Sequence, residues 1–236
     1  LSPRLHERAD AIVWFPNDFD PPSAEIREWL EDWLVAQPGR TLIYVGRDFD
    51  AAPWYWQEVL PGAPEDEVPE LQQREIAART DFGMERLAVP NSEDCDWFTV
   101  EGKALHREVR TLNGDPEWLE AIDASKLDIE LYGRLLSPDD ADVLLSSEGD
   151  VLVSRIERDE SRIIVIANGS FLLNAMLVNH EHRKLAGQLI EEVGPPEKTV
   201  VFLESWMGGP PIRDNDPMPG MPTGMEIFHI WPTNWI

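Results

Sequence analysis

The chain has 236 residues, which corresponds to one large domain or slightly more, and 42% of them are hydrophobic. This apolar content is ordinary for a globular protein and excludes an intrinsically disordered chain. Forty-five acidic residues oppose 20 basic ones, so the formal net charge is −25. This charge argues against nucleic acid as a partner, because the sequence has no basic stripe that would neutralise phosphates.

A single cysteine, Cys95, excludes an internal disulfide and any Cys-x-x-Cys metal or redox motif. No run reaches the ~18 apolar residues that a membrane-spanning helix requires. The sequence begins at Leu1 without a signal-like segment and ends in a tryptophan-rich stretch, residues 231–236. Two expectations stay open: a soluble fragment of a longer membrane-anchored protein, or a terminal strand that packs its tryptophans.

The first fifty residues carry the pattern of a strand–helix–strand unit. The apolar runs Ala11–Phe15 and Thr41–Val45 predict two buried strands. Between them, Ser23 is a candidate N-cap. The helix that follows has apolar residues at i, i+3, i+4, i+7 and i+8, namely Ile26, Trp29, Leu30, Trp33 and Leu34. Pro38-Gly39 ends this helix.

Residues 161–206 repeat the same pattern at the other end of the chain. Arg162–Ala167 and Thr199–Leu203 predict strands, and Asn179 is a candidate N-cap for the helix between them. Continuous apolar strands joined by crossover helices indicate a mostly parallel sheet covered on both faces. The two units together predict the α/β class, with a three-layer sandwich as the architecture.

Residues 51–160 form an inserted or irregular region between these units. Two helices are expected first, separated by Pro61–Pro64, and the second runs from Val68 to about Met84. Strands are then predicted at Asp128–Leu136, Val143–Ser147 and Val151–Ile156. The turn Ser147-Glu-Gly-Asp150 joins the last two as a hairpin, so the sheet gains an antiparallel extension.

Residues 207–236 differ from the α/β domain that we assign to residues 1–206. They are rich in proline, glycine and methionine, which predicts an irregular C-terminal arm or linker. Such arms often exchange between copies of a chain, so an oligomer formed through the arm is one expectation.

Polar residues follow each predicted parallel strand at its carboxyl end. Because these ends meet at one edge of the sheet, we expect a ligand site there, lined by Asn17, Asp18, Arg47, Asn168, Ser170 and Glu204. Arg47 is suited to hold an anion, and Asp18 with Glu204 offers acid–base chemistry as the alternative. The competing interpretation is that turns favour these residue types at strand ends.

No motif in the sequence identifies a reaction or a cofactor. The loop at Gly46 lacks both glycine patterns of nucleotide-binding loops, and Ser170 lacks the glycines of a nucleophile elbow. Cys95 lies in an acidic loop that disfavours the thiolate. On a helix His180 and His182 point apart, so we predict no metal site. Since the nucleotide-binding patterns are missing too, we also predict no bound cofactor.

Two blocks of the sequence resemble known families. The N-terminal block is similar to the strand–helix–strand unit of class I glutamine amidotransferase-like domains over residues 9–16, 26–34 and 39–46. The closing block resembles the bacterial family called domain of unknown function 4350 over residues 162–170, 173–174, 185–190 and 200–204. Asn174 belongs to the closing block and joins the candidate ligand-binding residues.

The resemblance implies a flavodoxin-like sandwich and a soluble, extracytoplasmic (periplasmic) domain tethered by flanking membrane helices, with the cytoplasm as the alternative location. Amidotransferases need a cysteine at a strand-to-helix elbow, and no predicted strand end carries one. We therefore predict a non-catalytic binding or assembly domain of a membrane-anchored bacterial envelope protein. Its partner would be another membrane-associated protein or a small polar ligand. The alternative is a carboxylate-dependent hydrolase or sugar-processing enzyme.

Overall fold

The computed structural model describes residues 1–89, 92–102, 104, 106–120, 122–205 and 209–216. The α-helices are α1 (Pro3–Arg8), α2 (Ala24–Val35), α3 (Ala51–Val59), α4 (Val68–Ala88), α5 (Pro116–Leu119) and α6 (His180–Val193). The strands of the main sheet are β1 (Ala11–Phe15), β2 (Thr41–Val45), β6 (Asn113–Gly114), β9 (Asp142–Ser147), β10 (Asp150–Arg158), β11 (Ser161–Ile166) and β12 (Val200–Glu204). Five short strands form two smaller sheets: β3 (Glu93–Asp94), β4 (Thr99–Glu101), β5 (Arg107–Glu108), β7 (Glu130–Leu131) and β8 (Arg134–Leu136).

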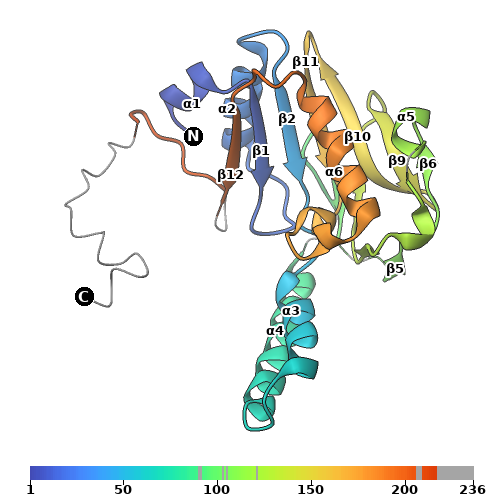
Figure 1. Ribbon diagram of the computed structural model, residues 1–236. Coiled ribbons are helices and arrows are strands. Elements are labelled where there is room, and N and C mark those ends of the chain that lie inside the picture. Colours follow the sequence, from blue (N-terminus) through green and yellow to red (C-terminus); the bar gives the residue numbers. More distant parts are fainter. Residues whose placement is uncertain (90–91, 103, 105, 121, 206–208, 217–236) are drawn as a thin grey trace.

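The main sheet has seven strands in the order β12-β1-β2-β11-β10-β9-β6 (Figure 1). β12, β1, β2 and β11 run parallel, and each later strand pairs antiparallel to its neighbour. This arrangement confirms the predicted α/β class, its parallel core and its antiparallel extension. Both strand–helix–strand units therefore contribute to one continuous sheet.

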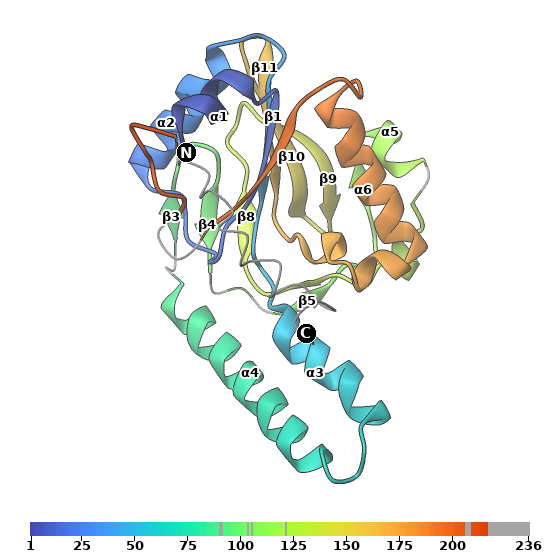
Figure 2. The same ribbon diagram turned by 60° about the vertical axis from the view of Figure 1, so that its left-hand side comes forward.

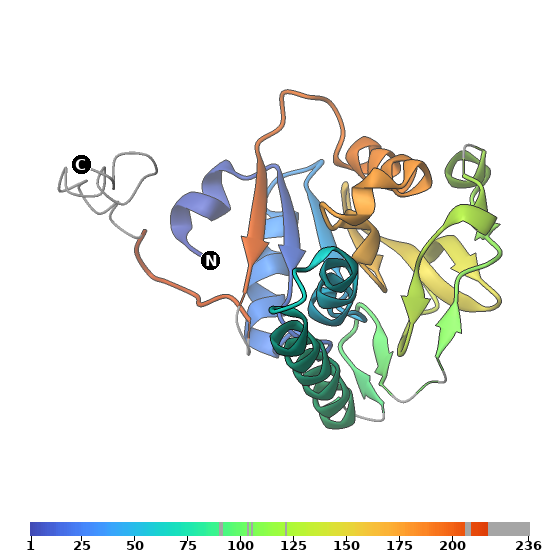
Figure 3. The same ribbon diagram turned by 60° about the horizontal axis from the view of Figure 1, so that its bottom comes forward.

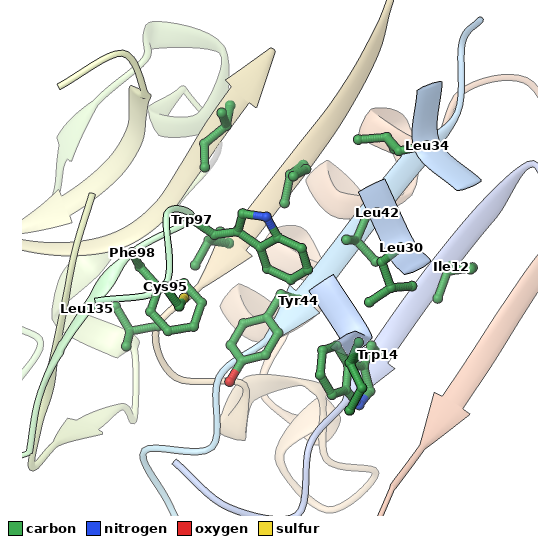
Figure 4. Close-up of a cluster of buried hydrophobic side chains, with 14 of the residues drawn as sticks. Ile12, Trp14, Leu30, Leu34, Leu42, Tyr44, Cys95, Trp97, Phe98 and Leu135 are labelled. Carbon is green, nitrogen blue, oxygen red and sulfur yellow. The ribbon is translucent and has the colours of Figure 1, made fainter. Parts of the chain in front are cut away.

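Alternation along the central strands divides the apolar residues between two cores. Ile12 and Trp14 of β1 face the core that contains Leu30 and Leu34 of α2 (Figure 4). Val13, between them, faces the other core, which contains Leu185 and Leu189 of α6. Helices therefore cover both faces of the sheet, as a three-layer sandwich requires. Val100 of β4, Leu135 of β8, and Trp97 and Phe98 directly before β4 extend the first core.

The β9–β10 hairpin turns where the sequence predicts it. Glu148 and Gly149 both have positive φ, 50° and 93°, which is the backbone of a tight hairpin turn. Asn179 likewise caps α6, because its Oδ1 accepts a hydrogen bond from the Glu181 backbone N–H at 2.9 Å. Ser23 occupies the N-cap position of α2 without making a side-chain cap hydrogen bond.

The predicted strand Asp128–Leu136 is wrong as a single element. It divides into β7, which pairs with β5, and β8, which pairs with β4. The backbone N–H groups of Tyr132 and Gly133 donate to the carboxylate of Asp48 at 2.7 and 2.8 Å. They therefore do not take part in the hydrogen bonds between strands. A distant side chain thus breaks a strand that the apolar pattern presents as continuous.

α3 and α4 form a helical hairpin that projects from the carboxyl edge of the parallel strands (Figures 1 and 2). α4 begins at Val68, as predicted, and continues to Ala88 instead of Met84. Of its residues only Ala78 is fully buried, so most of the helix contacts solvent. Figure 3, viewed toward this edge, shows the hairpin in front of the strand ends.

The part of the C-terminal arm that the structure describes lies against the N-terminus. The amino group of Leu1 donates to the Pro211 carbonyl at 2.8 Å, and the Arg213 N–H donates to the Leu1 carbonyl at 2.9 Å. Residues 209–216 contain no helix or strand. The predicted irregular arm beyond residue 216 and its tryptophan-rich end lie outside the described residues. Within the described ranges, no helix is both long and apolar enough to span a bilayer.

Candidate functional site

The carboxyl ends of the parallel strands lie at one edge of the sheet. Phe15 of β1 pairs with Glu204 of β12, and Ile166 of β11 pairs with Val45 of β2. The loops that leave these strands consequently begin close together, which is the usual place for a ligand in an open α/β sheet. The predicted site residues occupy these loops.

Three predicted residues, Asn17, Arg47 and Glu204, line one cleft of about 390 Å³ at this edge. We call it the rim cleft, and its other lining residues are Phe15, Pro16, Val45, Phe49, Ala51, Leu173 and Ser205. The walls are mainly apolar and the polar groups are few, a composition typical of small-molecule sites. The structure thus brings together residues from three different strand ends.

Among the described residues that line the rim cleft, Arg47 alone is positively charged. The residue is half-buried, and its backbone bridges to Asn168. Its guanidinium makes no ion pair or hydrogen bond with any of the described residues, including Glu204 on the same cleft. Asp18, Asp20 and Glu85 line the neighbouring cleft with Arg47 but form no ion pair with it. The guanidinium is therefore the group of the rim cleft that is suited to an anion from outside.

Asp18 lies beyond the rim cleft. It lines a neighbouring cleft of about 290 Å³ together with Asn17, Arg47 and Arg86. The two carboxylates that the sequence offers for acid–base chemistry, Asp18 and Glu204, therefore line different clefts. Asn174 is exposed and is not among the residues that line the rim cleft.

Asn168 has a structural position. It is 3% exposed, and its amide nitrogen donates to the carbonyls of Asp48 at 3.1 Å and Glu130 at 2.8 Å. Its oxygen accepts from the Ser170 N–H at 2.9 Å. The side chain thereby ties together the segments that follow β2 and β11 and the strand β7.

Replacing Asn168 with alanine is expected to lower the free energy of unfolding by about 1–3 kcal/mol, because it leaves buried backbone groups without partners. Asn174→Ala is the matched control, since it removes an exposed amide and should leave stability within about 0.5 kcal/mol. Urea denaturation of both variants measures the difference. Equal stability of the two variants would contradict the structural role of Asn168.

Asp48 is the buried carboxylate of this edge, at 1% exposure. It accepts from two backbone N–H groups and from Arg86 of α4, and so joins the hairpin to the sheet. Burial raises its pKa to about 6, while Arg86 and the N–H donors oppose the rise. The sequence places Asp48 after β2, but nothing in the sequence pattern identifies Arg86 as its partner.

The other candidates from the sequence are structural. Cys95 is buried in the first core, and burial raises the pKa of its thiol. His182 is fully buried, and its Nε2 accepts from the Asp128 N–H at 3.1 Å. Among the described residues no group of three or more histidine, cysteine, aspartate or glutamate side chains is arranged to hold a metal ion.

These features define an α/β domain with its polar residues gathered at the carboxyl edge of a parallel core. The family model described as domain of unknown function (DUF4350) matches residues 2–190, and the chain belongs to this family. Comparison with curated proteins and with solved structures gives no match.

Proposed function

We propose that this chain is a non-catalytic ligand-binding domain of a membrane-anchored bacterial envelope protein, with the rim cleft as its site. The ligand is small and polar and carries a negative charge that Arg47 holds. Another membrane-associated protein is the alternative partner. Placement within the class I glutamine amidotransferase-like superfamily is part of this proposal, and so is a location outside the cytoplasm with membrane helices flanking the domain; both rest on sequence resemblance.

The observation that carries the proposal is the guanidinium of Arg47, which pairs with none of the residues that the structure describes. Most other arginines near the sheet are neutralised: Arg86 contacts Asp48, and Arg107 and Arg134 contact Asp150. An arginine held half-buried without such a partner loses hydration and gains nothing from the protein in return. A bound carboxylate or phosphate supplies that missing partner through charge-assisted hydrogen bonds.

Binding accounts for the site better than catalysis does. General acid–base chemistry by two carboxylates requires both to reach the same substrate. Asp18 and Glu204 line adjoining clefts that share Asn17 and Arg47, and neither of these clefts is lined by both carboxylates. Cys95, the single cysteine, follows β3 of the small three-stranded sheet and is buried in the first core, so it does not lie at the end of a strand of the main sheet. Turnover of esters or glycosides by the wild type, abolished in the D18N/E204Q variant, would replace the proposal with the hydrolase alternative.

Arg47→Ala is expected to weaken binding of small anions about tenfold or more, since it removes charge-assisted hydrogen bonds. Calorimetric titration with phosphate, citrate and L-glutamate measures this loss. The matched control is Arg110→Ala, which removes the same charge from an exposed side chain that pairs with Glu108. Anion binding that survives Arg47→Ala, or is lost equally in the control, would contradict the assignment of the rim cleft.

A further inference from the structure

A second cleft, of about 430 Å³, lies where the α3–α4 hairpin meets the sheet, and no part of the proposed function uses it. We call it the hairpin cleft. The helices supply Trp54 and Gln57 from α3 and Arg79 and Phe82 from α4. The opposite side comes from the segment around β7, with Asp128, Glu130 and Tyr132, and from Ser170 after β11.

Aromatic rings form much of the wall. Tyr132 packs edge-on against Phe82, with ring centroids 5.2 Å apart and planes at 86°. Trp54 is half-buried on α3, and Phe49 lines both this cleft and the rim cleft. Exposed aromatic faces of this kind attract cations through the ring quadrupole.

The charge of the hairpin cleft is opposite in sign to that of Arg47. Three carboxylates, from Asp50, Asp128 and Glu130, face one guanidinium, from Arg79. Arg79 is already neutralised by Glu75 within α4, and Asp50 caps the first turn of α3 through the Ala52 N–H at 2.9 Å. Asp128 and Glu130 therefore determine the charge that a ligand meets.

These two carboxylates sit on a rigid backbone. The N–H of Asp128 donates to the buried His182 at 3.1 Å, and the carbonyl of Glu130 accepts from the buried Asn168 at 2.8 Å. The Glu130 carboxylate accepts from the Tyr132 hydroxyl at 2.7 Å and lies 3.4 Å from the His106 imidazole, whereas the Asp128 carboxylate makes no hydrogen bond or ion pair with the described residues. A backbone that is fixed before binding limits the entropy lost when these exposed carboxylates meet a ligand.

Ser170 supplies an independent sign of a missing ligand group. The residue lines the hairpin cleft at 7% exposure, and its hydroxyl has no hydrogen-bond partner in the described structure. Buried hydroxyls in folded proteins nearly always have a partner, so an unsatisfied one in a residue that lines a cleft points to a polar group there. The Ser170 Oγ is itself shielded from solvent, so a ligand group reaches it only if the neighbouring wall of the cleft moves.

We propose that the hairpin cleft binds an organic cation, an alkyl ammonium or guanidinium group whose charge meets Asp128 and Glu130 and whose carbon chain packs on Trp54 and Tyr132. The group belongs either to a free amine or to a lysine or arginine side chain of a peptide. The hairpin cleft and the rim cleft, which share Phe49 as a lining residue, thus select opposite charges.

Calorimetric titration at low ionic strength tests this with pentylamine, agmatine, and lysine and arginine blocked at both termini. Pentanol and blocked norleucine are the neutral analogues. We expect the cations to bind and the neutral analogues to bind at least tenfold more weakly. Tighter binding of the blocked amino acids identifies a peptide side chain as the source, and tighter binding of the free amines identifies a small molecule.

The D128N/E130Q variant is expected to weaken cation binding at least tenfold. Its control is D139N/E160Q, which removes two exposed carboxylates from turns outside the cleft and should keep affinity within twofold. The control distinguishes binding in the cleft from the general attraction of cations to a protein of net charge −25. Equal losses in the two variants, or equal binding of pentylamine and pentanol, would overturn the proposal. Neither result depends on whether Arg47 binds an anion.

Discussion

Replacing Asp48 with alanine is expected to lower the free energy of unfolding by about 3–5 kcal/mol at pH 7. The change leaves the guanidinium of Arg86, which is 13% exposed, without its carboxylate. It also leaves the N–H groups of Tyr132 and Gly133 unsatisfied in a buried site. Removing one member of a buried ion pair is costly because the remaining charge stays out of water. Chemical denaturation monitored by circular dichroism measures the loss.

Asp139→Ala provides the control for this experiment, because it removes an exposed carboxylate and should change stability by less than about 0.5 kcal/mol. Hydrogen exchange adds a local test: protection should fall in α4 and around Tyr132 before it falls in β1 and β2. An Asp48→Ala variant as stable as the control would contradict the role of Asp48 as the anchor of the hairpin.

The pH dependence of the same difference has a defined sign. The folded pKa of Asp48, about 6, lies above the ordinary value of 3.8, so the folded state binds this proton more tightly than the unfolded state. The part of the stability that comes from this bound proton is complete below about pH 4 and is lost as the pH rises through about 6. The hydrogen bonds to Arg86 and to the two backbone N–H groups remain at pH 7. The stability difference between wild type and Asp48→Ala should therefore shrink across that window.

Trp33→Ala is expected to lower the free energy of unfolding by about 3–5 kcal/mol through the cavity that it leaves. Trp33 is fully buried on α2, and its indole N–H donates to the Ala9 carbonyl at 3.3 Å. The guanidinium of Arg40 lies 5.1 Å from the ring centroid, so the substitution also removes a cation–π contact. Thermal and urea unfolding would measure the loss.

Trp29→Ala is a matched change one helical turn away on α2. Trp29 is only partly buried and meets His6 edge-on at 5.5 Å, so its removal should cost about 1–2 kcal/mol. If the two variants lost equal free energy of unfolding, the loss would come from the change of residue type on α2 and not from the cavity left by the buried Trp33 ring. A Trp33→Phe variant should recover part of the loss by refilling the cavity.

The sequence predicts the elements of the fold better than their arrangement. The apolar runs of β1, β2 and β11 are strong signals because they are buried on both faces. The tight turn at Glu148-Gly149 is a local signal and is equally readable. The division of Asp128–Leu136 depends on Asp48, which lies far away in the sequence, so no local pattern contains it.

The candidate site is likewise predictable from the sequence only in part. The convergence of Asn17, Arg47 and Glu204 follows from the parallel order of the strands, which the crossover pattern predicts. The structural role of Asn168 and the pairing of Asp48 with Arg86 depend on side-chain geometry across distant segments. The sequence does not predict the hairpin cleft, because no local pattern shows that the second half of α4 packs near the sheet.

The strand order also bears on how fast the protein folds. β2 and β11 are neighbours in the sheet, yet residues 46–160 lie between them in the chain, and β1 finds its other neighbour only at β12. Closing such long loops precedes any gain from pairing, and high contact order slows folding. We expect the β9–β10–β11 hairpins to form early. The parallel centre would then assemble last and limit the refolding rate.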